Sequence, residues 1–463
     1  MITGYDHTCM SGFGQLTGKK LVELTEMFEP PFYVYDMQVV NTKHVAVKNM
    51  PNAFGLRPRY AMKANSNRSV LQFLAQRGWY FDCSTLNEVR RLRMAGIPVN
   101  RAMLTSQEVP SSKRNFTDLK GFMQDGMIYN ICSRTQLELV HDFAATNNLP
   151  VAMGVHPGEG GSGESGTRNT ADHYSCFRIH ISEFRDALKD ACDLRIVTVH
   201  DHIGSGGSPA KWQANVDRLP EIIEANLDLL PHLQNINFGG GVKEGRMPGE
   251  ERADLNQLGR YAKQCLISFA QKTGRRLTME IEPGTYMVAN AGYVVTKVVD
   301  KKSTGADGFD FIVLEGGCMT LNARPAMYCS EHPFYVVGTD GKILSTEREL
   351  SQINASLVIP VGTKCESGDS WALIRNVNEA GEIEEHVMPR FMADPGMGDY
   401  FVVGGCGAYC STMTPANYNS DVQPPEVLLM PDGEVVVGRG RQTLEQVVQN
   451  ERGLPDFNPS ELR

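Results

Sequence analysis

The chain has 463 residues, a length that favours two domains and allows one of them to be a large α/β barrel. Its formal net charge of −9, with both signs mixed along the sequence, excludes the basic stripe that binding to nucleic acid or an anionic membrane requires. We therefore expect a protein that acts on a small molecule.

The N-terminus, MITGYDHTCM, has no basic region followed by an apolar stretch, and the longest apolar runs, such as residues 311–314, are far shorter than a bilayer span. The eleven cysteines are scattered, and Cys406 and Cys410 are too far apart for a CxxC metal pair. This usage is typical of a reducing compartment. We expect a soluble, unexported, cytoplasmic protein without a metal site.

Short β-rich runs alternate with helical patterns from about residue 32, as in βαβ units with a parallel sheet. One predicted helix covers residues 87–96, where apolar residues recur every three or four positions. Eight candidate strands predict an α/β fold with a (β/α)8, TIM-like barrel. They cover residues 32–36, 59–65, 79–84, 102–106, 150–157, 194–204, 236–241 and 277–284.

After about residue 290 the pattern changes to β-branched runs separated by turn signals, with TDGK and PDGE typical of hairpin turns. We predict a barrel domain at 36–290 and a second, mostly antiparallel β domain formed by 291–463 with the N-terminal segment 1–35. The Gly-rich stretch 158–166 indicates a flexible loop.

Lys63, in YAMKAN, stands in an apolar strand where an ammonium is costly to bury. A lysine at a strand end whose charged tip reaches solvent is the simpler explanation. The alternative is a Schiff-base lysine with a depressed pKa. The residues that share its surroundings decide between the two.

Three other motifs each end a predicted strand. His202 and Ser205 lie in HDHIGSG, where an imidazole could stack on a ring and a hydroxyl could bind phosphate. Gly239, Gly240 and Gly241 form a loop whose amides can approach phosphate oxygens. Glu282, in EIEPG, could keep a pyridine nitrogen protonated. Each has an ordinary structural explanation alone, but the strand ends of a barrel converge on one site.

With these motifs the chain is similar to the fold-type III pyridoxal-phosphate decarboxylases, and most of all to the diaminopimelate decarboxylases. The similarity runs from PPFYVYD near residue 30 to PPEVLL ending at 429, and it includes FDCSTLNE, LNARPAMY, CESGD and GAYCSTMTPANYNS. The resemblance implies pyridoxal 5′-phosphate as cofactor, bound covalently by Lys63. It also implies the following site residues: His202 on the ring, Glu282 at the pyridine nitrogen, Ser205, Gly239, Gly240, Gly241 and Tyr409 at the phosphate, and Asp82 and Glu88 beside the lysine.

The resemblance further implies a homodimer with shared sites, in which Cys365 and Glu366 of CESGD reach into the partner's site. Cys365 would donate the proton that replaces the departing carbon dioxide. Its alternative role is that of a buried, inert thiol. A monomer should be inactive.

Substrate choice depends on groups remote from the cofactor. Arg324 and Tyr328 resemble the pair that binds the far carboxylate of diaminopimelate, since a guanidinium suits bidentate carboxylate binding. Glu366 would contact the substrate's amine, and Tyr409 lies with these groups. The expected reaction is decarboxylation of meso-diaminopimelate to L-lysine, the last step of lysine biosynthesis.

Two segments depart from the family pattern. Thr285 stands where an arginine is expected after EPG, which removes a positive charge near the phosphate and the distal carboxylate. In HYSCFRI, Cys176 and Arg178 stand where lysine and glycine are expected. Arg178 is one candidate for the missing charge, and a surface arginine on a loop is the other interpretation.

Thr285 keeps open a decarboxylase of the same fold that acts on ornithine, lysine, arginine or a siderophore or antibiotic precursor. A racemase of this fold fits CESGD and NARPAMY less well. A non-catalytic regulatory relative would be expected to lack Lys63 or Cys365, and both are present.

Overall fold

The computed structural model describes Met10 and residues 14–158, 175–204, 208–346, 355–377 and 382–455. Most of the predicted Gly-rich loop at 158–166 lies outside the described residues. None of the helices in the described ranges combines the length and apolarity needed to cross a membrane.

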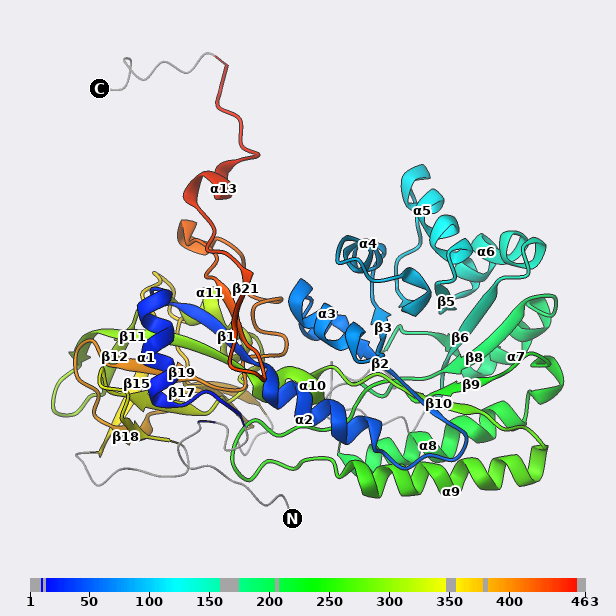
Figure 1. Ribbon diagram of the computed structural model, residues 1–463, viewed down its shortest axis with the longest axis horizontal. Helices are drawn as coiled ribbons and strands as arrows, with labels where there is room; N and C mark the ends of the chain where they lie inside the picture. Colours follow the sequence, from blue (N-terminus) through cyan, green and yellow to red (C-terminus); the bar gives the residue numbers. More distant parts are fainter. Residues whose placement is uncertain are drawn as a thin grey trace.

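Among the described residues, eight parallel strands form a closed barrel, because β10 pairs with β2 and β5 pairs with β6. Figure 1 shows it on the right. A short ninth strand, β7 (Ile179–His180), pairs in parallel with the end of β6. The barrel strands are β2 (Leu56–Ala61), β3 (Tyr80–Cys83), β4 (Ala102–Thr105), β5 (Ile128–Ile131), β6 (Pro150–His156), β8 (Arg195–His200), β9 (Asn235–Asn237) and β10 (Thr278–Ile281).

The predicted barrel is confirmed, but one of its eight strands was wrongly assigned. Residues 32–36 form β1, which pairs with β11 and β20 of the other sheet. The missing barrel strand is β5, which the sequence analysis did not detect. β1 is a fully buried apolar run and matches a parallel barrel strand locally, so its pattern alone did not reveal its partners.

A helix follows each barrel strand, and most of them surround the barrel. The helix predicted at 87–96 is α4, which begins after the N-cap Thr85. The helices that follow the strands are α3 (Arg68–Gln76), α4 (Leu86–Met94), α5 (Lys113–Gln124), α6 (Arg134–Thr146), α7 (Ile181–Asp190), α8 (Pro209–Glu224), α9 (Leu255–Thr273) and α10 (Thr285–Val288).

The second domain is built on a mostly antiparallel sheet, as predicted, with parallel pairing of β1 with β20 and of β12 with β15. The expected hairpins at 339–342 and 431–434 join β13 to β14 and β20 to β21. Its strands are β1 (Phe32–Asp36), β11 (Gly292–Ser303), β12 (Asp310–Leu314), β13 (Phe334–Val337), β14 (Ile343–Ser345), β15 (Ala355–Val361), β18 (Arg390–Ala393), β19 (Tyr400–Val403), β20 (Glu426–Leu429) and β21 (Val435–Arg439), with a separate hairpin of β16 (Leu373–Val377) and β17 (Ile383–Val387).

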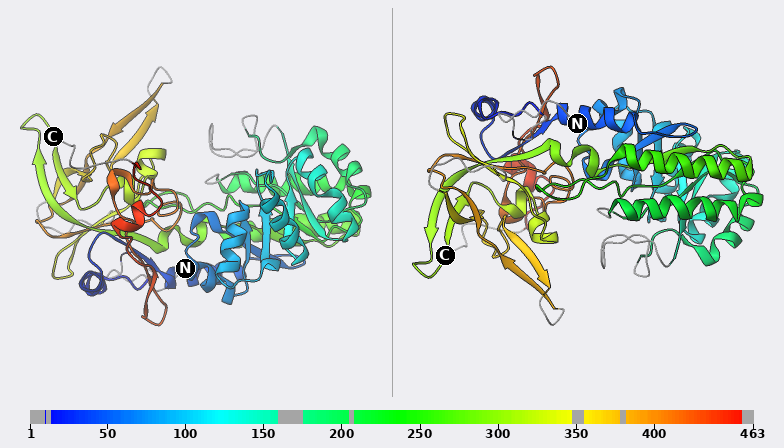
Figure 2. Two further views of the ribbon diagram at one scale, coloured as in Figure 1. Left: turned by 90° about the horizontal axis from the view of Figure 1, so that it is seen from above. Right: turned by 90° about the horizontal axis from the view of Figure 1, so that it is seen from below.

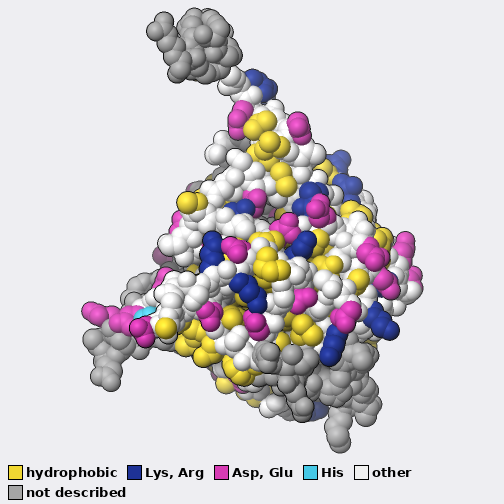
Figure 3. Space-filling view, turned by 90° about the vertical axis from the view of Figure 1, so that its left-hand side faces the viewer, with side chains coloured by type: hydrophobic (Ala, Val, Ile, Leu, Met, Phe, Trp, Pro, Cys, Tyr) yellow, Lys and Arg dark blue, Asp and Glu magenta, His cyan; other side chains and the backbone are white. Residues whose placement is uncertain are grey.

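The barrel and the sheet domain lie end to end in both views of Figure 2. The predicted boundaries at 36 and 290 stay a prediction. On the face of the sheet domain in Figure 3, Lys and Arg alternate with Asp and Glu. The remaining elements are α1 (Gly18–Met27), α2 (Met37–Lys48), α11 (Cys318–Leu321), α12 (Arg324–Tyr328), α13 (Leu444–Val448) and the 3-10 turns η1 (Met62–Ala64), η2 (Val99–Arg101), η3 (Leu227–Leu229), η4 (Ala289–Ala291) and η5 (Tyr418–Ser420).

Candidate active site

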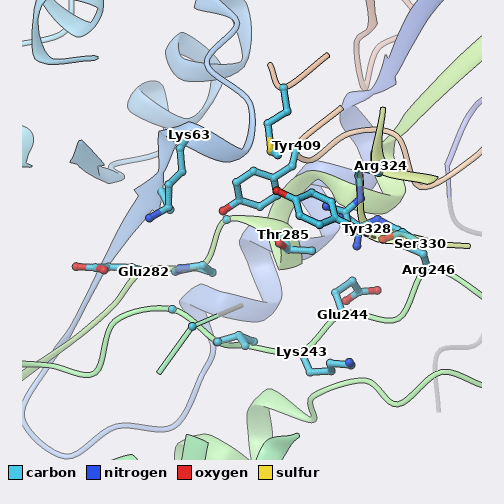
Figure 4. A pocket seen from close by; sticks show the side chains of 18 of the residues that line it. Lys63, Lys243, Glu244, Arg246, Glu282, Thr285, Arg324, Tyr328, Ser330 and Tyr409 are labelled. Carbon is cyan, nitrogen blue, oxygen red and sulfur yellow. Dashed lines mark hydrogen bonds between the residues drawn. The ribbon is translucent and has the colours of Figure 1, made fainter. Parts of the chain in front are cut away.

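A cavity of about 580 Å³ lies where the C-terminal ends of the barrel strands meet the sheet domain. Its size is in the range of small-molecule sites. Figure 4 shows the arrangement of its side chains. The predicted residues that line it are Lys63, His202, Gly240, Gly241, Glu282, Thr285, Arg324, Tyr328 and Tyr409. Residues from both domains therefore form one site.

Lys63 lies in η1, directly after β2, and its surroundings are acidic. Burial alone would lower the pKa of Lys63, but the charges of Asp82, Tyr409, Glu282 and Glu88 raise it instead. The expectation of a depressed pKa was therefore wrong for the protein without cofactor. The carboxylates that the sequence analysis placed beside the lysine stabilise its ammonium form.

Asp82 is buried at the end of β3, and its Oδ1 has no hydrogen-bond partner among the described residues. Burial and the nearby Glu282 raise the pKa of Asp82 to about 7, although Lys63 opposes this effect. Glu88 accepts a hydrogen bond from the Ser84 N–H at 2.6 Å, and burial raises its pKa. Neither carboxylate lines the cavity, so both act on Lys63 from behind it.

Glu282 is held ionised at the end of β10. The Asn237 amide donates to its Oε1 at 2.7 Å, and His200 Nε2 lies 3.3 Å from its Oε2. Burial opposes ionisation, but His200, His202 and Lys63 lower the pKa of Glu282 to about 2. The carboxylate is thus a fixed negative charge opposite the amine of Lys63.

His202 is a neutral ring at the edge of the cavity. Its Nδ1 accepts a hydrogen bond from the Gly204 N–H at 2.8 Å. Burial, together with the positive charge of Lys63, lowers the pKa of His202 to about 3. An uncharged imidazole can pack against a flat aromatic ring without a desolvation penalty for a cation.

The loop after β9 packs tightly against the His202 segment. A Cβ on Gly240 would lie 2.7 Å from His202 Nε2, and one on Gly239, which has φ +62°, would lie 2.4 Å from the Asp201 carbonyl oxygen. Gly240 and Gly241 line the cavity, whereas Gly239 lies behind it. Larger residues would not fit here. Ser205, which was also predicted to bind the phosphate, lies outside the described residues.

Tyr409 connects the two domains at the site. Its N–H donates to the Ala64 carbonyl at 2.9 Å, and Thr412 Oγ1 lies 3.3 Å from the Lys63 carbonyl oxygen. The segment that follows β19 is therefore attached to the turn that carries the lysine. Tyr409 lines the cavity between Lys63 and the arginine end in Figure 4.

The end of the cavity away from Lys63 is basic. Arg324 lies at the start of α12, 5.4 Å from the centre of the Tyr328 ring, and its Nη2 donates to Ser330 Oγ at 3.1 Å. Its Nε is buried without a partner among the described residues. Arg246, which the sequence analysis missed, lines the same end.

Cys365 and Glu366 do not line the cavity of their own chain. Cys365 is exposed, which corrects the interpretation of it as a buried, inert thiol, and its N–H donates to Asn419 Oδ1 at 3.3 Å. The Tyr418 hydroxyl lies 3.4 Å from Glu366 Oε2. The two residues of CESGD are thus placed on the surface, away from Lys63.

Arg178 is neither a surface arginine nor a residue of the cavity. Its Nη2 lies 3.0 Å from Asp201 Oδ1 and donates to the His202 carbonyl at 2.9 Å, while its Nε donates to the Val155 carbonyl at 3.1 Å. Both side chains of the Arg178 and Asp201 pair are buried. Arg178 therefore supports the His202 segment and does not replace the arginine missing at Thr285. Cys176 is exposed.

A family model described as the pyridoxal binding domain of pyridoxal-dependent decarboxylases matches residues 38–289, more than half of the chain. The chain belongs to this family. It is a pyridoxal-phosphate-dependent decarboxylase with the fold-type III barrel, as the motifs predicted.

Two curated relatives of this decarboxylase match along nearly their whole length. The diaminopimelate decarboxylase of Escherichia coli K12 is 29% identical over 450 residues, which are 96% of this chain and 98% of the relative. That of Methanothermobacter thermautotrophicus is 28% identical over 447 residues, 94% of each chain.

Solved structures match the decarboxylase equally broadly. A crystal structure of diaminopimelate decarboxylase has a TM-score of 0.81 and 27% identity, covering 96% of this chain and 99% of that one. The Helicobacter pylori diaminopimelate decarboxylase complexed with L-lysine has a TM-score of 0.77 and 23% identity, covering 92% and 98%. The second match supports the fold alone.

The cavity of this decarboxylase fits pyridoxal phosphate. Lys63 offers an amine, the ionised Glu282 faces the same space, and the Gly240–Gly241 backbone is free of side chains that would block a phosphate. Asp82, whose buried Oδ1 has no partner among the described residues, lies behind Lys63 and not in the cavity. Lys63, Glu282, Gly240 and Gly241 would hold the group.

His200, Asn237 and Arg246 belong to the site of this decarboxylase but were missed in the sequence. Side chains two residues apart on a strand share a face, so Asn237 and His200 could have been expected to point into the barrel with the other site residues. Arg246 lies in the segment between β9 and α9, where no repeating pattern indicates direction.

Proposed function

We propose that this decarboxylase converts meso-diaminopimelate to L-lysine and carbon dioxide. The observation that carries the proposal is the basic end of the cavity, where Arg324 stands beside Tyr328, opposite the amine of Lys63. An amino acid that reaches from Lys63 to Arg324 needs a second carboxylate at its far end. The relatives named diaminopimelate decarboxylase support this choice.

When bound, pyridoxal phosphate supplies an electron sink for the pair of electrons released as the carboxylate leaves. Glu282 is ionised at neutral pH and would keep the pyridine nitrogen of the cofactor protonated. His202, neutral and fixed by Gly204, would cover one face of the ring. Lys63 would bind the cofactor covalently, and Gly240, Gly241 and Tyr409 would surround its phosphate.

Loss of carbon dioxide breaks the bond between the α-carbon and its carboxylate, and one proton must replace the carboxylate on that carbon. We assign this proton to the Cys365 thiol of a partner subunit, with Glu366 of the same subunit contacting an amine of the substrate. Neither side chain lines the cavity of its own chain, which supports a homodimer with shared sites.

The free thiols support the reducing, cytoplasmic location that we propose for the enzyme. The buried Cys406 and Cys410, for example, are free thiols. The domain limits at 36 and 290 belong to the same proposal.

Thr285 supports one second candidate, a decarboxylase of another amino acid such as ornithine, lysine or arginine. The residue lines the cavity without a positive charge. Those substrates carry no carboxylate at the far end, so they would leave Arg324 without an anion.

Carbon dioxide release by the cofactor-loaded enzyme from meso-diaminopimelate tests the proposal, with L-ornithine, L-lysine and L-arginine measured in parallel and Lys63→Ala as the inactive control. We expect turnover of meso-diaminopimelate alone. Release from one of the other three, without release from meso-diaminopimelate, would establish the second candidate instead.

A further inference from the structure

A second guanidinium belongs to the basic end of the cavity. Arg246 lies in the segment between β9 and α9, yet its Nε donates to the Gly405 carbonyl at 3.0 Å and its Nη2 lies 3.3 Å from the Ala408 carbonyl oxygen. A Cβ on Gly405 would lie 3.0 Å from Arg246 Cδ. The arginine is therefore fixed against the segment that leads to Tyr409.

The acidic side chains of the cavity are engaged elsewhere. Glu244 pairs with Lys43 at 2.5 Å, Glu331 pairs with Arg390 at 3.5 Å, and Glu250 accepts the backbone N–H of Arg246 at 2.8 Å. Within the described residues, no carboxylate lies within 4.0 Å of the guanidinium of Arg246 or Arg324. Both cations thus face the cavity without a directly paired carboxylate among those residues.

The two arginines also act on each other. Burial and the charge of Arg324 lower the pKa of Arg246 to about 10. Two like charges in a partly desolvated cavity repel, and an anion between them offsets both the repulsion and the desolvation. The neutral protein groups at this end, Tyr328 and Ser330, cannot do so.

The position of Arg246 indicates which anion it binds. Figure 4 shows it with Arg324, Tyr328 and Ser330, on the side away from Lys63 and Glu282. The charges that act most strongly on it are those of Arg324, Cys410, Cys406 and Glu250. When the reacting carbon of the substrate lies at Lys63, the carboxylate at the far end of the substrate is therefore the group nearer to Arg246.

We propose that Arg246 and Arg324 together bind the distal carboxylate of the substrate, so that Arg246 supplies the positive charge that Thr285 does not. Arg246 is then a specificity-determining residue, which favours amino acids with two carboxylates. The inference rests on the proposed function for the identity of the substrate.

The test measures ligand binding rather than turnover. L-Lysine bound as the product, with its ε-amine at the Lys63 end, keeps the distal carboxylate of diaminopimelate, whereas 1,5-diaminopentane has the same two amines and no carboxylate. We would measure the dissociation constants of both for the cofactor-loaded wild type, Arg246→Gln, Arg246→Lys and, as a matched control outside the cavity, Arg260→Gln on α9.

Arg246→Gln should weaken L-lysine binding by about 10- to 100-fold, the usual effect of losing a charge-assisted hydrogen bond, and should leave 1,5-diaminopentane binding unchanged. Arg246→Lys should retain part of the L-lysine affinity, because the charge remains. Arg260→Gln should match the wild type for both ligands.

Two results would overturn the inference. If Arg246→Lys bound L-lysine as weakly as Arg246→Gln does, the loss would reflect the missing carbonyl contacts and not the charge. If Arg246→Gln bound L-lysine normally but needed more pyridoxal phosphate for saturation, Arg246 would serve the cofactor's phosphate.

Failure of the proposed function is measured separately, as absence of turnover of meso-diaminopimelate by the wild type. In that case calorimetric titration with pimelate, a dicarboxylate of the same chain length, decides the role of Arg246. Weaker binding of pimelate to Arg246→Gln than to the wild type would support the inference, and equal binding, or no binding to the wild type, would overturn it.

Discussion

His200 Nε2 lies 3.3 Å from a carboxylate oxygen of Glu282 inside the barrel. The other ring nitrogen of His200 lies 3.0 Å from the Asn130 amide nitrogen, so the imidazole is fixed on both sides. We expect Glu282→Gln, which keeps the shape and removes the charge, to lower kcat by about 100- to 1000-fold, as the loss of a preorganised electrostatic group does. Carbon dioxide release measures this. Glu282→Asp, which keeps the charge, should retain more activity, and a Gln variant with the wild-type rate would contradict the role.

His200 is a positioning residue whose effect should appear in the pH profile. Burial opposes ionisation of Glu282, and the pKa of about 2 depends on His200 among other groups. In His200→Phe we expect the pKa of Glu282 to rise, so that kcat falls as the pH is lowered through a new acid limb that the wild type lacks. A pH–kcat curve with the wild-type shape and a lower plateau would indicate a purely structural role.

Asp82 should make the stability of the cofactor-free protein depend on pH. Its pKa of about 7 lies above the ordinary value of 3.8 because of burial and Glu282. The folded state therefore binds the proton of Asp82 more tightly than the unfolded state does. The resulting contribution to stability is complete below about pH 4 and is lost as the pH rises through about 7.

In Asp82→Asn the side chain cannot ionise, so this pH-dependent contribution to stability is absent. We expect the melting temperature of the variant to rise relative to the wild type between pH 5 and pH 8, by an amount equivalent to at most ~4 kcal/mol. Asp125→Asn, an exposed position in the same domain, is the control. A constant difference across the pH range would show that Asp82 does not titrate there.

Arg178→Met should lower stability without changing substrate affinity. The substitution leaves the buried Asp201 carboxylate without its partner, which typically costs about 3 to 5 kcal/mol. Thermal denaturation measures this loss, and the control is Arg185→Met, whose exposed pair with Asp228 should matter little. An unchanged melting temperature together with a raised KM for meso-diaminopimelate would instead place Arg178 at the substrate.

Mixing two inactive variants tests the shared sites. Lys63→Ala lacks the cofactor lysine and Cys365→Ala lacks the proposed proton donor, so each homodimer should be inactive. If the subunits exchange at random, half of the dimers combine both variants and have one intact site, which restores up to about a quarter of the wild-type activity. Mixtures that stay inactive, although mass spectrometry detects mixed dimers, would place Cys365 in its own chain's site.

Most of the barrel could be predicted, because βα alternation is a local pattern. The assignment of β1 to the wrong sheet shows the limit. β1 pairs with β20, where Tyr33 lies opposite Glu426, and this partner is nearly the whole chain away. The short β5 has no local feature that distinguishes it from a loop segment. Pairing with other strands, and not strand propensity, decided both cases.

The site was predictable where a motif ends a strand, since Lys63, His202 and Glu282 are placed by the barrel itself. The pKa of Lys63 was not predictable, because it depends on the carboxylates of Asp82, Glu88 and Glu282 and on Tyr409, which only the folded chain brings together. Arg246 was missed for the same reason, because the Gly405 and Ala408 carbonyls of the other domain orient its side chain.

The position of β1 between β11 and β20 has a consequence for synthesis of the chain. The last pair of residues in the β1–β20 register is Asp36 and Leu429, and all barrel strands lie between them in the sequence. The central sheet therefore cannot be completed until the ribosome has released β20. At 5 to 20 residues per second, β1 waits roughly 20 to 80 s for that partner. β11 can pair with one edge of β1 earlier, but the edge that faces β20 stays open during this interval, which makes the nascent chain a natural client for chaperones that bind extended segments.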